Sequence, residues 1–421
     1  MKTSAIFRIF TGILVFFLLV PAGFSQGRDS YHTITGLVRD SQTRRPIAYA
    51  SVFIDQAEVG TVTNVDGGFI LKIDKDLGVT HFSISHLGYR SARYRVTDYV
   101  LGDRHEFLLE PTTVLLQEVV IRPSDARSLV EQAIAKITSN YPDRNYRLTG
   151  FYREAIKQRR DYVSISEAVV EVDQTPYYPN SSADRVKIVQ GRKSGDVKRM
   201  DTLIVKLQGG PHVSMLLDIV KNPNVLLDKE FLNYYTYEMV DLVKLEDQTN
   251  YVVEFKPRAT LPYPLYYGRL YISTDKLAIT MAEFSLDISD KNKAVQNFVM
   301  RKPSRLRFTP TRTSYLVTYI EVDGKYHVNY VRNELEFFAD WRAKIFRTNY
   351  LVMSELAITG RKPDGSERFP VRETFRRGNI LADMVPVYFD ENFWGAYNVI
   401  EPDESIESAI RKLNTRLERE Q

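Results

Sequence analysis

Residues 34–73 read ITGLVRDSQTRRPIAYASVFIDQAEVGTVTNVDGGFILKI and residues 79–90 read VTHFSISHLGYR, and these two stretches decide the fold of the first part of the chain. Short runs rich in β-branched residues are separated by turn residues at close spacing. Ala50, Val52 and Ile54 alternate along one run and therefore share one face of a strand. This pattern predicts a small antiparallel β-sandwich.

The same spacing carries a family resemblance. The order G-x-V-x-D, P-I-x-x-A-x-V, G-T-x-T-N-x-D-G-x-F and S-x-x-G-Y begins at Gly36 and ends at Tyr89. It resembles the carboxypeptidase-like regulatory domain, a transthyretin-like β-sandwich, as found in envelope proteins of Bacteroidetes type. The resemblance covers residues 33–109, and a strand-like run at 115–121 is expected to complete the domain at residues 33–122. It implies an accessory domain rather than a catalyst.

Residues 1–25 are predicted to be a signal peptide. Lys2 and Arg8 form a basic start, residues 9–20 form a short apolar core, and a small-residue stretch ends at Ser25. The core is short for a bilayer span, and no later segment approaches about 18 apolar residues. We therefore expect an exported protein, periplasmic or associated with the outer membrane, with no transmembrane span in the mature chain.

The composition narrows the range of functions. A chain of 421 residues predicts two or three domains. Removal of Lys2 and Arg8 lowers the formal charge from +4 to +2, so nucleic acid is not expected as a partner. The absence of cysteine from the sequence excludes disulfides, thiolate catalysis and thiolate metal sites.

A linking helix is predicted at residues 124–140. Ser124 can cap it, and Leu129, Ala133 and Ile137 recur at the spacing of one helix face. In TonB-dependent outer-membrane receptors of the Bacteroidetes, a similar sandwich and a similar L-x-E-V-V-V segment precede a plug and a barrel of about 22 strands. About 300 residues remain in this chain, which is too few for that architecture.

From residue 146 the hydrophobic period becomes two, which predicts a large curved antiparallel sheet at residues 146–400. Asp323-Gly324 is the strongest hairpin signal in the chain. A second amphipathic helix is predicted at residues 404–420. The candidate strands are residues 146–157, 162–172, 203–207, 235–245, 251–256, 268–273, 278–287, 313–322, 326–338 and 348–358.

Part of the predicted sheet resembles a second known fold. Residues 267–273 and 278–284 are similar to a strand pair of the LolA-like lipoprotein-carrier fold, an unclosed barrel wrapped over helices. The expected fold class is therefore mainly β, with the sandwich, the linking helix, the curved sheet and a C-terminal helix in that order. The sequence does not decide between an open LolA-like sheet and a closed sheet.

The sequence contains no recognisable catalytic motif. None of the six histidines begins a zinc-peptidase motif, and no G-x-S-x-G elbow, P-loop or dinucleotide fingerprint occurs. We interpret His81 and His86 as polar residues at a sandwich edge, Asn64 and Asp66 as turn residues rather than calcium ligands, and residues 191–195 as a solvated hairpin. No catalytic residue, metal or cofactor is predicted. An enzyme with scattered carboxylates stays open, because such pairs have no fixed spacing.

Aromatic residues supply the candidate ligand site. The chain contains 26 Tyr and 22 Phe, many of them in the alternating stretches. One interpretation is a cleft for a lipid, glycan or peptide that is lined by rings with polar tips. The other interpretation is that the rings cover the core of the sheet. The candidate cleft residues are Tyr235, Tyr237, Tyr267, Tyr271 and Phe284.

Two functions fit these observations. The first is a non-enzymatic exported envelope protein whose sandwich and sheet domain bind other proteins. The alternative is a periplasmic lipid or lipoprotein carrier of LolA-like type. A small outer-membrane barrel fits less well, because Arg332 and Glu334 interrupt a strand face that should be apolar toward lipid, and because the chain ends in a charged amphipathic helix.

Overall fold

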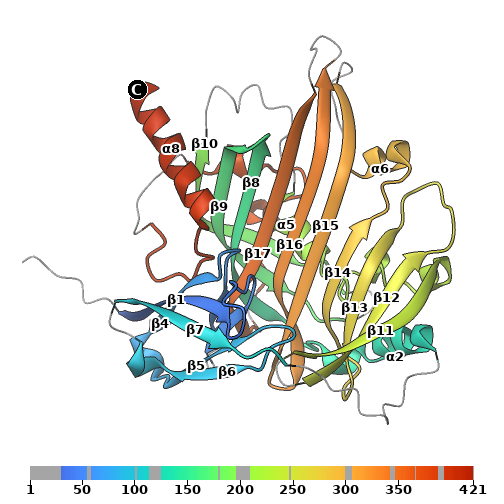
Figure 1. Ribbon diagram of the computed structural model, residues 1–421, viewed down its shortest axis with the longest axis horizontal. Coiled ribbons are helices and arrows are strands. Elements are labelled where there is room, and N and C mark those ends of the chain that lie inside the picture. The colour runs from blue at the N-terminus through green and yellow to red at the C-terminus, as the bar shows by residue number, and fades with distance from the viewer. Residues whose placement is uncertain are drawn as a thin grey trace, which may run out of the picture.

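A computed structural model describes residues 30–54, 58–99, 102–112, 125–178, 181–195, 209–245, 248–298, 306–341, 347–365, 367–386 and 393–420. The protein is mainly β, as predicted, and a small N-terminal sandwich lies against a large open sheet (Figure 1). The predicted signal peptide and the predicted strands at 115–121 and 203–207 lie outside the described residues. Within the described part of the chain, no helix is both long and apolar enough to cross a membrane.

The N-terminal sandwich consists of two sheets with the strand orders β4-β1-β7 and β3-β2-β5-β6. Its strands are β1 (Tyr31–Asp40), β2 (Ser51–Ile54), β3 (Gly60–Val62), β4 (Gly68–Asp74), β5 (His81–Ser85), β6 (Ala92–Arg95) and β7 (Arg104–Leu109). The predicted face of Ala50, Val52 and Ile54 is confirmed, since all three side chains are buried in the core with Phe69 and Phe107. β1 and β7 pair in parallel, so the prediction of a purely antiparallel sandwich is wrong at this strand pair.

The large sheet has ten antiparallel strands in the order β10-β9-β8-β17-β16-β15-β14-β13-β12-β11. Its strands are β8 (Tyr146–Gln158), β9 (Asp161–Gln174), β10 (Arg185–Gly195), β11 (Tyr235–Leu245), β12 (Gln248–Pro257), β13 (Tyr266–Ser273), β14 (Ile279–Leu286), β15 (Leu306–Val322), β16 (Lys325–Trp341) and β17 (Thr348–Pro363). The edge strands β10 and β11 do not pair with each other, so the sheet is open rather than closed. β17 inserts between β16 and β8, which joins the late and early parts of the chain.

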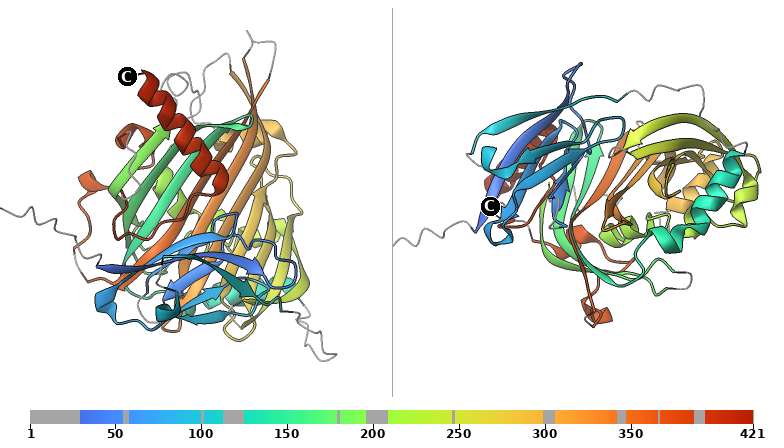
Figure 2. Two further views of the ribbon diagram at one scale, coloured as in Figure 1. Left: turned by 60° about the vertical axis from the view of Figure 1, so that its left-hand side comes forward. Right: turned by 90° about the horizontal axis from the view of Figure 1, so that it is seen from below.

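Helices cover one face of this sheet, which we call the inner face. In Figure 2, α2 lies within the curve formed by β11, β12 and β13. Leu129 and Val130 of α2 and Met215 of α5 are buried in one core with Val170, Leu356 and other inner-face residues. The helices and 3-10 turns are η2 (Lys75–Leu77), η3 (Val96–Asp98), α2 (Ala126–Ala135), α3 (Ile137–Asn140), α5 (Gly210–Leu216), η4 (Pro223–Val225), η5 (Phe231–Tyr234), α6 (Lys291–Phe298), η6 (Val371–Glu373), α7 (Leu381–Met384) and α8 (Glu404–Glu420).

The opposite face, the outer face, is covered by the sandwich and by the C-terminal part of the chain. Residues 393–403 run over this face between the sandwich and α8 (Figure 1). Ile406, Ala409 and Ile410 of α8 then pack on outer-face residues that include Ala155 and Met353. The predicted C-terminal helix is thereby confirmed, and its apolar stripe has a partner within the chain.

The N-cap of the linking helix lies one residue later than predicted. Asp125 is the N-cap, because its side chain accepts a hydrogen bond from the backbone N–H of Arg127, whereas Ser124 lies outside the described residues. The helix is also interrupted, so that α2 and α3 replace the single predicted helix at residues 124–140.

Two further predictions for the sheet have opposite outcomes. The Asp323-Gly324 turn joins β15 to β16, and both residues have positive φ, as a two-residue hairpin turn requires. The prediction of a solvated hairpin at residues 191–195 is wrong, because these residues form the end of β10. Charged residues interrupt the hydrophobic alternation by which this strand could have been predicted. Arg192, for example, is buried against Glu167 of β9.

Candidate functional site

A single row of side chains crosses all ten strands of the large sheet on its outer face. Each member is the direct cross-strand partner of the next, and nine of the ten are charged. From β10 to β11, this outer row consists of Arg192, Glu167, Arg153, Glu355, Arg332, Leu316, Glu283, Arg269, Glu254 and Glu238. Positive and negative side chains alternate on each side of Leu316 as far as Glu254, which faces the like-charged Glu238, and directly opposed opposite charges stabilise a strand pair.

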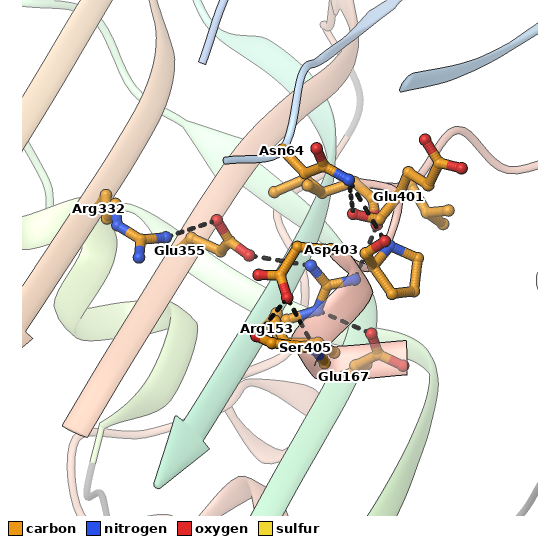
Figure 3. A network of polar contacts seen from close by, with 12 residues as sticks. Asn64, Arg153, Glu167, Arg332, Glu355, Glu401, Asp403 and Ser405 are labelled. Atoms are coloured by element: carbon orange, nitrogen blue, oxygen red, sulfur yellow. Dashed lines mark hydrogen bonds and ion pairs between the residues drawn. The ribbon is translucent and has the colours of Figure 1, made fainter. Parts of the chain in front are cut away.

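The first half of the outer row is a buried ion-pair network (Figure 3). Arg153 is 1% exposed, and its Nε and Nη1 atoms lie 2.8 Å and 3.0 Å from carboxylate oxygens of Glu167 and Glu355. Arg192 pairs with the second oxygen of Glu167 at 2.9 Å, and Arg332 pairs with Glu355 at 3.0 Å. Each buried carboxylate therefore lies between two guanidinium groups.

Burial and charge act in opposite directions on these groups. Burial alone would raise the pKa of the Glu167 carboxyl, but Arg153 and Arg192 hold it below its usual range. Burial likewise lowers the pKa of Arg153, and the two flanking carboxylates more than offset this effect and raise it. Both shifts favour the charged forms, so Glu167 and Arg153 stay ionised at neutral pH.

The C-terminal segment closes this half of the outer row. Nη2 of Arg153 donates a hydrogen bond of 2.7 Å to the carbonyl of Ile400. The guanidinium of Arg192 lies 5.0 Å from the ring centroid of Trp394, which also packs edge-on against Phe151 of β8. Val399 and Ile400 are buried in the same small apolar cluster. A turn at residues 393–396 and the irregular stretch that follows it thus cover the charged row with an aromatic ring, a carbonyl and aliphatic side chains.

The sandwich holds this segment from its other side. The amide of Asn398 makes two hydrogen bonds, of 2.7 Å and 2.9 Å, to the backbone of Lys72 in β4. Glu401 accepts two hydrogen bonds, of 2.9 Å and 2.7 Å, from Arg104 of β7. Asn64 donates to the carbonyls of Glu401 and Pro402. The Asn64 turn therefore serves to hold the C-terminal segment.

The sandwich also contacts the sheet directly. The ring of Tyr49 stacks on Tyr330 with a centroid distance of 5.4 Å. The guanidinium of Arg332 lies 5.1 Å from the centroid of the Tyr49 ring. Asn329 donates to the hydroxyl of Ser51 at 2.9 Å. Tyr49 and Arg332 therefore mark the point at which the covered half of the outer row ends.

The second half of the outer row forms the floor of an open groove. The groove has a volume of about 520 Å³. It is lined by Tyr49, Glu254, Phe255, Lys256, Tyr267, Gly268, Arg269, Glu283, Phe284, Ser285, Ser314, Tyr315, Leu316, Arg332 and Glu334. Arg269 and Glu283 are exposed on its floor, and Tyr49 contributes to its wall from the sandwich.

The charges of the groove are largely paired within the protein. Lys256 lies 2.7 Å from Glu254, and Arg332 lies 2.7 Å from Glu334. Burial alone would raise the pKa of Glu334, but Arg332 lowers it below its usual range. A general acid at neutral pH needs a raised pKa, so this carboxylate suits the recognition of polar groups better than proton transfer.

A second polar row lies on the inner face, one residue away from the buried ion pairs. Ser166, Glu154, Ser354 and Asn333 are cross-strand partners in β9, β8, β17 and β16. The Tyr152 hydroxyl donates to Glu154 at 3.0 Å, and burial raises the pKa of this carboxyl to about 8. Within the described residues, the buried Ser166 hydroxyl has no hydrogen-bond partner. The inner face thus holds a protonated carboxyl at neutral pH.

The sheet separates the five residues of the predicted aromatic cleft. Tyr235 and Phe284 are buried in the inner core, and Tyr237 packs against that core. Tyr271 is buried in a different cluster with Val252 and Met281, and its hydroxyl donates to Glu283 at 2.9 Å. Tyr267 is exposed in the groove.

Sequence reasoning missed the charged members of the groove. Their signal was present, because Arg269 and Glu283 interrupt otherwise apolar or aromatic strands at alternate positions. Arg332 and Glu334 were noticed, but as an argument against a barrel rather than as part of a site. The register that aligns these residues depends on strand pairings between distant parts of the chain.

Residues 34–121 match the family model of the CarboxypepD_reg-like domain. This confirms the predicted resemblance for the sandwich. No curated protein matches the chain.

Two solved structures show a remote likeness to the chain. One is a DUF1329 family protein from Desulfovibrio piger, with 10% identity, a TM-score of 0.25, and coverage of 58% of this chain and 96% of that one. The other is a structure of lipovitellin described by its lipid–protein interactions, with 11% identity, a TM-score of 0.24, and coverage of 58% and 28%.

Proposed function

We propose that this chain is a non-enzymatic exported protein of the cell envelope that binds another protein through the groove beside Tyr49. The observation that carries this proposal is the division of the outer row. One half is covered by the chain itself, and the other half lies open beside the CarboxypepD_reg-like domain. The predicted signal peptide supports export.

The groove is well suited to binding because its walls are held in place before a ligand arrives. Tyr49 is fixed by Tyr330 and Arg332, and Arg332 is fixed in turn by Glu334 and Glu355. Preorganisation of this kind lowers the conformational entropy that is lost on binding. The accessory domain therefore acts as one wall of the site.

The carrier alternative places a lipid on the inner face of the curved sheet. In the structure, side chains of α2 and α5 pack on that face, and Phe284 stacks on Tyr315 at 5.0 Å. The polar groove lies on the other face, which favours the protein-binding proposal. Mass spectrometry of organic extracts from the purified protein distinguishes the two, because a carrier should retain near-stoichiometric lipid.

Site-specific photo-crosslinking tests the proposal. A photoreactive amino acid at Tyr267, which is exposed in the groove, should crosslink to a defined protein in cells that export the chain. The same amino acid at Leu77, which is comparably exposed in the sandwich, serves as the control. Equal yields at both positions, or turnover of an ester, glycoside or peptide panel at enzyme-like rates, would contradict the proposal.

A further inference from the structure

We propose that the open half of the outer row takes a polypeptide segment without regular secondary structure that lies across β12, β13 and β14, and this inference rests on the proposed function. The covered half of the same row provides the precedent. There, residues 393–403, a turn followed by a stretch without regular secondary structure, already lie over the alternating charges of β8 and β10. The two halves belong to one continuous register, so they offer an incoming chain the same spacing of groups.

The precedent identifies three contacts that an incoming segment would make. In the covered half, a row arginine donates to a backbone carbonyl, a second row arginine lies near an aromatic ring, and aliphatic side chains are buried in the same apolar cluster as that ring. These contacts involve Arg153, Arg192 and the pair Val399 and Ile400. They use the main chain and common side chains, so a polypeptide from another protein can reproduce them.

The open half presents equivalent groups. Arg269 lies between Glu254 and Glu283 on the neighbouring strands, just as Arg153 lies between Glu167 and Glu355. Arg269 is exposed, whereas Arg153 is buried under the C-terminal segment. Leu316 and the ring of Tyr271 supply apolar surface on the same face. Arg269 is therefore the group that would donate to a carbonyl of the segment and stack against an aromatic side chain.

The charge at one end of the row specifies the partner further. Glu238 and Glu254 face each other directly across β11 and β12, and like charges in this position repel each other. Lys256 pairs with Glu254, whereas Glu238 is exposed at the edge strand. A basic side chain in the partner would relieve this repulsion. The preferred segment therefore combines an aromatic residue over Arg269 with a basic residue toward β11.

A peptide selection on the full chain tests this inference. The probe is a phage-displayed library of random linear peptides, and enriched peptides are then synthesised and their Kd values measured. Arg269→Glu should weaken binding at least tenfold. The substitution replaces a hydrogen-bond donor by a carboxylate, which repels the carbonyl oxygen of the peptide. Arg95→Glu, which changes an exposed arginine on the edge strand β6 of the sandwich, should leave Kd unchanged. Thermal melts of both variants confirm that they fold.

The possible results separate this inference from the proposed function. Enriched peptides that carry aromatic and basic residues and lose affinity in Arg269→Glu support the inference. Peptides that bind Arg269→Glu as tightly as the wild type, or the failure of any peptide to enrich, overturn it. If a partner still crosslinks at Tyr267 in that case, the groove binds a folded surface and the proposed function stands. If no partner crosslinks either, both fail.

Discussion

The guanidinium of Arg153 donates a hydrogen bond of 2.7 Å to the carbonyl of Ile400 and thereby connects β8 of the ten-stranded sheet to the C-terminal segment. The same side chain neutralises Glu167 and Glu355. One buried residue thus joins three strands to the segment that covers them. This arrangement keeps the sandwich, the sheet and the C-terminus in fixed relation.

Replacement of Arg153 should destabilise the protein strongly. Arg153→Ala leaves Glu167 and Glu355 buried with one cationic partner each, and loss of one member of a buried ion pair costs about 3–5 kcal/mol. Arg312→Ala is the control, because Arg312 is 48% exposed and pairs with Glu334 and Glu336 at the surface. Its cost should be about 1 kcal/mol or less. Urea denaturation measures both, and equal losses would show that burial of the network contributes nothing.

The buried carboxyl of Glu154 should make stability depend on pH. Burial raises its folded-state pKa to about 8, above the value of an exposed glutamate, so the folded state holds a proton that the unfolded state releases at lower pH. Stability should therefore fall between about pH 5 and pH 8, by up to about 1.4 kcal/mol per pH unit. Glu154→Gln keeps an acceptor for Tyr152 and should remove this loss. Parallel pH profiles for variant and wild type would speak against the prediction.

Gly67 and Gly78 form a matched pair of left-handed glycines. Both have positive φ, but a Cβ at Gly67 would lie 2.4 Å from the carbonyl oxygen of Val38, whereas a Cβ at Gly78 meets nothing within 4 Å. Gly78→Ala should cost about 1 kcal/mol from backbone strain alone. Gly67→Ala adds a backbone clash and should cost clearly more. Similar melting temperatures for the two variants would show that the turn relaxes freely.

The start of α8 depends on one aspartate. Asp403 accepts a hydrogen bond of 2.7 Å from the backbone N–H of Ile406 and another of 2.6 Å from the Ser405 hydroxyl. Loss of an N-cap costs about 1 kcal/mol, so Asp403→Ala should loosen the first turn of the helix. Hydrogen exchange at the Ile406 amide should accelerate, while Asp403→Asn should retain most of the protection. An unchanged exchange rate in the alanine variant would show that Asp403 does not stabilise the start of α8.

Local signals were sufficient for most individual elements. Alternating apolar residues and short turns predicted β8, β9 and β11 to β17, because strand periodicity and turn chemistry depend on neighbours in the sequence. The Asp323-Gly324 hairpin was correct for the same reason. β10 was missed because Arg192 and Lys193 obscure its periodicity, and Arg192 is compensated by Glu167, which only the folded chain brings close.

The sandwich, the strand-rich second part and the C-terminal helix follow from local residue patterns and could be predicted from the sequence. The outer row and the groove arise only from tertiary contacts. Arg153 and Glu355 are 202 residues apart along the chain and meet because β17 inserts beside β8. A shift of one residue in that register would move every side chain to the other face. The site is therefore a property of long-range strand pairing, which no local pattern records.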